Sequence, residues 1–110
     1  MLRMVALDSA IAVTEAMRRR YEGTANARAL GVALLHLSAA EADVRPDSAL
    51  QHAARALPLL EAANDTVYRH GTAGHLVRLR LQRAQRALTR GDTAAAIASL
   101  AAAAPSHCVR

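Results

Sequence analysis

The sequence predicts an all-α fold, and three features of its composition lead to that prediction. The 110 residues include 28 Ala and 15 Leu, and all 14 basic residues are Arg; these are strong helix formers. Phe and Trp are absent and only two Tyr are present, whereas β-strands are enriched in aromatic and β-branched residues. Pro and Gly number only 3 and 5, so few positions can interrupt a helix. We therefore expect one small domain of about five helices.

The first two helices are bounded by turn signals. The first is expected from about Met4 to Tyr21, because Glu22-Gly23-Thr24 supplies a C-terminal glycine and a residue that can cap the next helix. The second is expected from about Ala25 to Ala42. A residue that precedes proline is pushed out of the helical region, so Arg45, before Pro46, should not be helical.

The third helix should begin at Asp47 or Ser48 and reach about Ala62. Pro58 lies inside it and should kink it or end it early, because proline lacks the N–H group and clashes with the preceding turn. The next stretch, which contains Asn64-Asp65, Gly71 and Gly74, is expected to be an irregular polar connector.

The fourth helix is expected over 74–89 and the fifth over 93–104, separated by a Gly91-Asp92-Thr93 turn and stopped by Pro105. Helical periodicity divides the fourth helix into two opposite faces. One face is apolar and comprises Val77, Leu81, Ala84 and Leu88, and the other carries Arg83, Arg86 and Arg90.

An internal repeat links the helices in pairs. A shift of 47 residues superimposes nine apolar positions of the second and third helices on apolar positions of the fourth and fifth. The matched pairs are Leu30/Val77, Val32/Leu79, Leu34/Leu81, Leu37/Ala84, Ala40/Ala87, Ala49/Ala96, Leu50/Ile97, Ala53/Leu100 and Ala56/Ala103. The expected units are 1–22 as the second helix of an incomplete first repeat, 24–62 and 74–104 as helical hairpins, and 105–110 as a flexible tail.

The turn and last helix resemble a known repeat. Gly91-Asp92, the following Ala residues, Ile97, Leu100 and Ala103 are similar to the turn and second helix of a tetratricopeptide repeat (TPR). Over about Ala29 to Ala104, this resemblance implies an α-α superhelix, a TPR-like array of helical hairpins. It also implies that the array is a protein-protein interaction module that captures a peptide or helix on its concave face.

Residues 81–105 also resemble the repeat-bearing tail of actinobacterial helix-turn-helix transcriptional regulators. The resemblance implies the regulatory or ligand-sensing part of a bacterial transcription regulator. The N-terminal DNA-binding domain of that family has no counterpart in the sequence, so DNA binding is not implied.

The charge pattern suggests where a partner would bind. A formal net charge of +5 suits a protein or peptide partner with acidic groups. The expected partner-binding residues are Arg80, Arg83, Arg86 and Arg90, since guanidinium groups bind carboxylates or phosphates with two parallel hydrogen bonds. The alternative interpretation of these residues is an ordinary solvated helix face.

An incomplete first repeat should leave an apolar edge at Val5, Ile11 and Met17. This edge could pair with preceding repeats, with a partner, or with a second copy to form a homodimer.

The sequence excludes several classes of site. One Cys, Cys108, cannot form an intramolecular disulfide and indicates a reducing, cytoplasmic location. His107 and Cys108 alone cannot make a four-ligand zinc site, and His70 and His75 match no catalytic motif. We therefore expect no enzyme activity, cofactor or metal, and no apolar run reaches the length of a membrane span.

Two rival functions stay open: a small basic helical protein that binds nucleic acid, and a structural fragment of a larger solenoid without its own activity. Nucleic-acid affinity would fall steeply with salt, and the scarcity of aromatic residues disfavours single strands, which are bound largely by stacking. The identity of the partner, the oligomeric state and any small-molecule ligand cannot be read from the sequence.

Overall fold

The computed structural model describes residues 2–103, and the side chains from residue 6 onward. The predicted all-α fold is confirmed over this part of the chain, which contains five helices and no strand. The helices are α1 (Leu2–Tyr21), α2 (Ala27–Glu41), α3 (Pro46–Ala62), α4 (Thr66–Thr89) and α5 (Thr93–Ala103).

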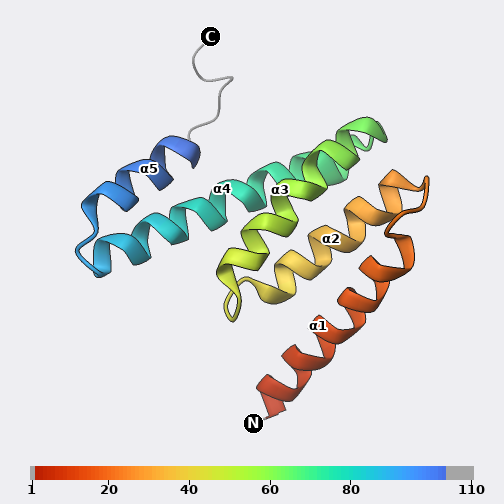
Figure 1. The fold of residues 1–110 in the computed structure, drawn as a ribbon, viewed down its shortest axis with the longest axis horizontal. Helices are drawn as coiled ribbons and strands as arrows, with labels where there is room; N and C mark the ends of the chain where they lie inside the picture. Colours follow the sequence, from red (N-terminus) through yellow and green to blue (C-terminus); the bar gives the residue numbers. More distant parts are fainter. Residues whose placement is uncertain (1, 104–110) are drawn as a thin grey trace.

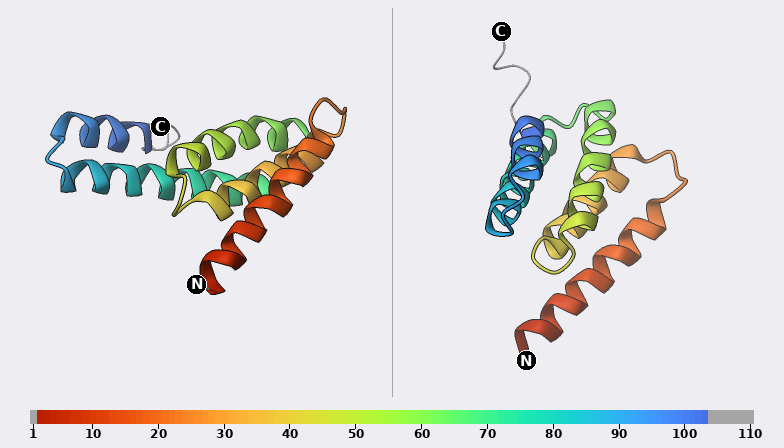
Figure 2. Two further views of the ribbon diagram at one scale, coloured as in Figure 1. Left: turned by 60° about the horizontal axis from the view of Figure 1, so that its bottom comes forward. Right: turned by 60° about the vertical axis from the view of Figure 1, so that its left-hand side comes forward.

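Each helix packs mainly against the helices that precede and follow it in the chain (Figure 1). Thus α2 and α3 form one antiparallel hairpin, α4 and α5 form a second, and α1 packs on α2. Figure 2 shows that α1 leans away from the other helices toward its N-terminus. The molecule measures 45 × 40 × 21 Å and has a radius of gyration of 14.9 Å, against about 13 Å for a globular chain of this length.

Short polar side chains begin the helices, and glycines end them. The Asn26, Asp65 and Asp92 side chains accept hydrogen bonds from backbone N–H groups in the first turns of α2, α4 and α5. Gly23 and Gly91 adopt φ angles of 76° and 78° after α1 and α4, a conformation that glycine adopts without steric cost.

The start of α4 corrects the predicted connector. The helix begins at Thr66, not near Gly74, so that Gly71 and Gly74 lie inside it. A glycine inside a helix costs only about 1 kcal/mol relative to Ala. Burial of Thr72 and Leu76 against the rest of the molecule offsets this cost. The second hairpin therefore spans 66–103, and Ala104 and the predicted tail at 105–110 lie outside the described residues.

The prediction that α3 reaches about Ala62 is confirmed, and of the two effects expected of Pro58 an early end of the helix does not occur. The helix continues past Pro58 to Ala62. It buries Ala53 and Ala56 before the proline and Leu60 after it, whereas Pro58 itself is exposed. Packing on both sides of the proline therefore holds the last turn in helical form. Arg45 is non-helical as predicted, with φ −136°, and Pro46 is the first helical residue.

The core is built of Leu and Ala in two clusters. The first joins α2 to α3 and contains Leu30, Leu34, Ala56 and Leu60, with Tyr21 and Tyr68 packed against it. The second joins α3 to the first half of α4 and contains Ala49, Ala53, Leu76 and Leu79. The α2–α3 hairpin and the first half of α4 are thus the best-packed part of the molecule.

The buried face of α4 differs from the predicted one. Ala84 is buried and Val77 is half-buried, but Leu81 and Leu88 are exposed. The positions buried in the first half are Thr72, Leu76 and Leu79, and Arg83, Arg86 and Arg90 continue the same spacing of four and three residues. The Arg row therefore follows the buried side of the first half. It begins beside Asp47, where α3 starts.

Candidate functional site

A groove of about 300 Å³ lies between the start of α3, the middle of α4 and α5. Its lining residues are Leu50, Arg80, Arg83, Ala95, Ala98, Ser99 and Ala102. Two of the four predicted partner-binding arginines therefore lie in a groove whose other lining side chains are uncharged and mostly small.

Arg80 and Arg83 lie three residues apart on α4, which places them on neighbouring positions of one helix face. Arg80 is half-buried, and the side chain of Arg83 is 54% exposed. An Arg83 nitrogen lies 3.8 Å from an Asp47 carboxylate oxygen, and the Asp47 side chain is well exposed. Such an exposed ion pair contributes at most about 1 kcal/mol, so a competing carboxylate could displace Asp47.

Arg86 and Arg90 do not line the groove. Arg86 is half-buried, and Arg90 is the exposed C-cap residue of α4. Cationic side chains near a helix C-terminus are favoured by the helix dipole, which accounts for both residues without a ligand. Their role in partner binding stays a prediction.

The residues of the predicted N-terminal edge, Val5, Ile11 and Met17, are not shown to form one exposed surface. Met17 is exposed, Ile11 is half-buried about 120° round the helix from it, and the Val5 side chain lies outside the described residues. The exposed apolar positions of α1 that do share one side are Ala6, Ala10, Val13 and Met17. We call this set the α1 stripe.

Ser38 and His75 meet inside the molecule, with Ser38 Oγ 2.9 Å from His75 Nε2. Ser38 is fully buried, and its hydroxyl donates its only proton to the Ala49 carbonyl oxygen at 2.6 Å. It must therefore accept from a protonated Nε2, so this nitrogen cannot act as a base toward Ser38. Burial, together with nearby Arg78, lowers the pKa of His75 from its ordinary 6.5. The pair is a buried structural contact between α2, α3 and α4.

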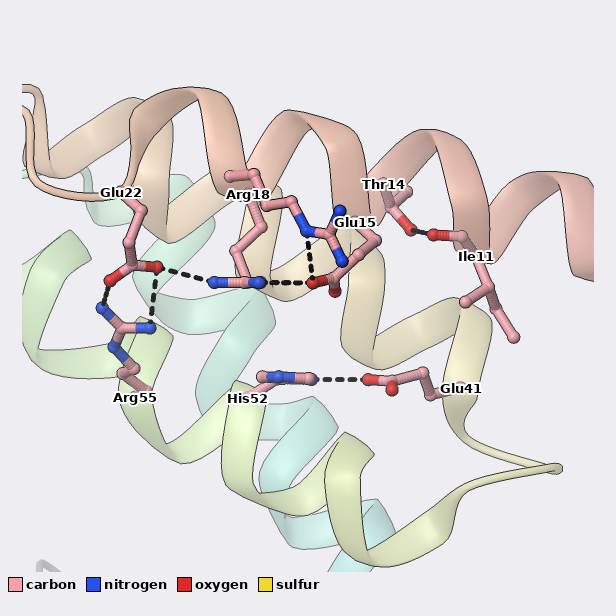
Figure 3. A network of polar contacts seen from close by, with 9 residues as sticks. Ile11, Thr14, Glu15, Arg18, Glu22, Glu41, His52 and Arg55 are labelled. Carbon is pink, nitrogen blue, oxygen red and sulfur yellow. Dashed lines mark hydrogen bonds and ion pairs between the residues drawn. The ribbon is translucent and has the colours of Figure 1, made fainter.

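A polar network joins α1 and Glu22, the residue that follows it, to α3 (Figure 3). Arg18 bonds both Glu15 and Glu22, and Glu22 also pairs with Arg55 of α3. The hydrogen bond from Arg18 holds the pKa of Glu15 below its ordinary value, and the bond from Arg55 does the same for Glu22. These groups satisfy one another and leave no nucleophile or base toward a cavity, which indicates that they fix the position of α1.

Glu41 and His52 form a second polar contact in this region (Figure 3). His52 Nδ1 lies 2.5 Å from a Glu41 carboxylate oxygen, and the Glu41 side chain is only 3% exposed. A buried carboxylate needs such a partner, so His52 has a structural role in joining α2 to α3.

The sequence interpretation missed both buried pairs, Ser38/His75 and Glu41/His52. The signal available in the sequence was the presence of Ser38 and Glu41 in the otherwise apolar second helix, where each would need a polar partner. Their partners are 37 and 11 residues away in the chain, and only the packing of the hairpins identifies them. His70 lies in α4 and is exposed, whereas a connector was expected at this position.

Within residues 2–103, no three His, Cys, Asp or Glu side chains are grouped so that they could hold a metal ion. His107 and Cys108 lie outside the described residues. None of the described helices is long and apolar enough to cross a membrane.

The chain is thus an all-α protein whose helices pack as hairpins, with a groove that contains Arg80 and Arg83 between α3, α4 and α5. No protein-family model, curated protein or solved structure matches the chain.

Proposed function

We propose that the chain is a TPR-like protein-interaction module and that the groove between α3, α4 and α5 binds an acidic segment of a partner protein. The observation that carries the proposal is the position of Arg80 and Arg83 in a groove otherwise lined by uncharged side chains. The repeated hairpin and the resemblance of residues 91–103 to a TPR turn and helix support the class of module.

The chemistry of the groove suits a carboxylate flanked by small apolar side chains. Each guanidinium offers a planar set of N–H donors that matches a carboxylate. Ala95, Ala98 and Ala102 lie three and four residues apart on α5, so their methyl groups form a smooth surface against which a peptide backbone can lie closely. An acidic segment rich in Ala or Ser would fit this combination of charge and shape.

The wider setting that we propose is the regulatory part of a bacterial transcription regulator, in the cytoplasm. It rests on the resemblance of residues 81–105 to the repeat-bearing tail of such regulators. Within this setting the module binds protein, and the proposal assigns no DNA contact to it.

The binding test uses a fluorescein-labelled peptide that alternates Glu and Ala, titrated with the full chain and followed by fluorescence anisotropy. Arg80→Gln combined with Arg83→Gln should weaken binding by about tenfold or more, since a hydrogen bond to a charged group contributes about 1.5–3 kcal/mol. The matched control is Arg19→Gln combined with Arg69→Gln, which removes the same charge from two exposed sites outside the groove and should keep near wild-type affinity.

Equal weakening in both double variants would show a general charge effect and would count against the groove. A labelled DNA duplex is the second probe. If the duplex binds more tightly than the peptide, with a steep fall in affinity as salt is raised, the nucleic-acid alternative replaces this proposal.

A further inference from the structure

Besides Val67 at the start of α4, four large aliphatic side chains are exposed on the α4–α5 hairpin. They are Leu81 and Leu88 of α4 with Ile97 and Leu100 of α5, each 46–62% exposed. Leu81 and Leu88 are seven residues apart and Ile97 and Leu100 are three apart, so each pair shares one side of its helix. None of the four lines the groove that contains Arg80 and Arg83. We call this set the C-terminal apolar face.

The internal repeat shows what kind of structure covers the equivalent face of the first hairpin. The positions 47 residues before Leu81, Ile97 and Leu100 are Leu34, Leu50 and Ala53. Leu34 and Ala53 are fully buried and Leu50 is half-buried. Leu34 belongs to the first cluster, against which Tyr68 of α4 packs. Ala53 belongs to the second cluster and Leu50 packs against it, and this cluster includes Leu76 and Leu79 of α4.

Other repeat-related positions are buried in both hairpins. Leu37, Ala49 and Ala56 of the first hairpin are buried, and their counterparts are buried in the second hairpin. These counterparts are Ala84, Ala96 and Ala103. The two hairpins therefore share these buried positions, and within residues 2–103 only the first is followed by a helix that packs on it.

The covering helix, α4, presents a narrow stripe to the first hairpin. Thr72, Leu76 and Leu79 are buried at a spacing of four and three residues. The C-terminal apolar face should therefore accept a single helix that carries uncharged residues at this spacing.

The α1 stripe meets this requirement. Ala6, Ala10, Val13 and Met17 follow a spacing of four, three and four residues, and all are exposed. None carries a charge, and the two Ala allow a close approach to the Leu and Ile side chains of the opposite face. Two surfaces, one on α1 and one on the α4–α5 hairpin, thus both consist of exposed apolar side chains without charge.

We propose that two copies of this chain associate head to tail, with the α1 stripe of one copy packed on the C-terminal apolar face of the next. The contact is heterologous, so it leaves a free stripe at one end of a dimer and a free face at the other and can extend to longer assemblies. It involves only four residues on each side, so it is smaller than a typical stable interface and should be weak. It does not involve the arginine groove and does not depend on the proposed function.

The test compares two variants of the full chain by sedimentation velocity over a range of concentrations. The stripe variant carries Val13→Glu and Met17→Glu, and the face variant carries Ile97→Glu and Leu100→Glu. All four residues are exposed, and circular dichroism checks that the helices persist. The control carries Val44→Glu and Val67→Glu, two exposed apolar sites outside both surfaces.

The wild type and the control should associate increasingly as concentration rises, whereas each of the two variants alone should stay monomeric. An equimolar mixture of the stripe variant and the face variant should form a one-to-one dimer and nothing larger, because the mixture contains one intact stripe and one intact face per pair. Serine in place of each introduced Glu repeats the test without added charge.

Three results would overturn the proposal. The wild type could remain monomeric at every concentration. One variant could associate as the wild type does, which would show symmetric pairing through the surface that it retains. The mixture of the two variants could remain monomeric.

Discussion

At Gly31, α2 packs closely against Leu59 and Leu60 of α3. A Cβ atom added there would lie 2.8 Å from Leu60 Cγ and 3.4 Å from Leu59 Cβ. Leu60 is fully buried, so its side chain has little room to move away. By contrast, a Cβ atom at Gly71 would meet nothing within 4 Å. Two helical glycines therefore have different reasons to be present, and a single methyl group distinguishes them.

We expect Gly31→Ala to destabilise the fold by about 1–3 kcal/mol through overpacking. Gly71→Ala should stabilise it by about 0.5–1 kcal/mol, because Ala favours the helix and has open space. Urea unfolding followed by circular dichroism measures both free energies of unfolding. A Gly31→Ala variant as stable as the Gly71→Ala variant would contradict the close packing at Gly31.

The lowered pKa of His75 predicts a fall in stability at mildly acidic pH. Because the folded-state pKa lies below the ordinary 6.5, the unfolded chain binds a proton that the folded chain does not in the range just below pH 6.5. The contribution of His75 is complete above this pH and is lost as the pH falls toward the folded-state pKa. Replacing His75 with a residue that does not titrate removes its contribution to the pH dependence of stability.

His75→Gln should therefore flatten the dependence of unfolding free energy on pH in the range just below pH 6.5. The measurement is urea unfolding of both proteins at matched pH values. An unchanged slope would show that His75 takes up its proton equally in the folded and unfolded chains. Glu15, Glu22 and Asp65 also have lowered pKa values, but they titrate below this range, from ordinary values of 4.5 or less.

At the scale of the helix, the sequence predicted helix ends correctly where a residue such as glycine adopts a backbone conformation that ends a helix. Gly23 and Gly91 end helices as predicted, and Pro46 begins one. The patterns failed at Gly71, which lies in a helix interior, and Pro58 does not end α3 early, which was one of its two expected effects. At those positions local preference competes with burial against other helices, and burial depends on contacts that periodicity along one segment does not reveal.

The same limit applies to the candidate site. Arg80 and Arg83 were identified from their residue type and spacing, but the groove between them and α5 depends on how α5 packs on α4. The predicted apolar face of α4 was partly wrong because α3 covers only its first half, so Leu81 and Leu88 stay exposed. Their exposure is what defines the C-terminal apolar face.

The first helix is attached differently from the others. None of its described side chains, from residue 6 to Tyr21, is fully buried. Tyr21 packs against the first core cluster, and Glu22 pairs with Arg55 of α3. A helix with so few buried contacts should open at a lower free energy than the rest of the fold.

We expect backbone amides of α1 to exchange hydrogen for deuterium faster than those of α2 and α3, as measured by mass spectrometry of peptic fragments. Arg55→Gln should raise the exchange of α1 by up to about fivefold, since it removes an ion pair worth at most about 1 kcal/mol. Exchange in α5, which Arg55 does not contact, is the internal control. Equal protection of α1 and α2 would show that α1 is part of the main cooperative unit.

Across the whole molecule, the array of hairpins was predictable because its repeat is visible in the sequence. Two hairpins with matching buried positions require only that apolar residues recur at the same spacing, as they do in Leu37/Ala84 and Ala49/Ala96. The extent to which each hairpin is covered was not predictable, since it depends on the next helix and not on the hairpin itself. The result is a slab 21 Å thick in its shortest dimension, with apolar side chains exposed at both ends.

The packing of each helix on its immediate predecessor also has a consequence for how the chain acquires its structure during translation. Most interhelical contacts join segments close in sequence, and chains with such short-range contacts fold rapidly. The α2–α3 hairpin can close as soon as residue 62 leaves the ribosome, because the contacts between its two helices lie within residues 27–62. The nascent chain would then present the finished hairpin as a template on which α4 forms while α5 is still being synthesised.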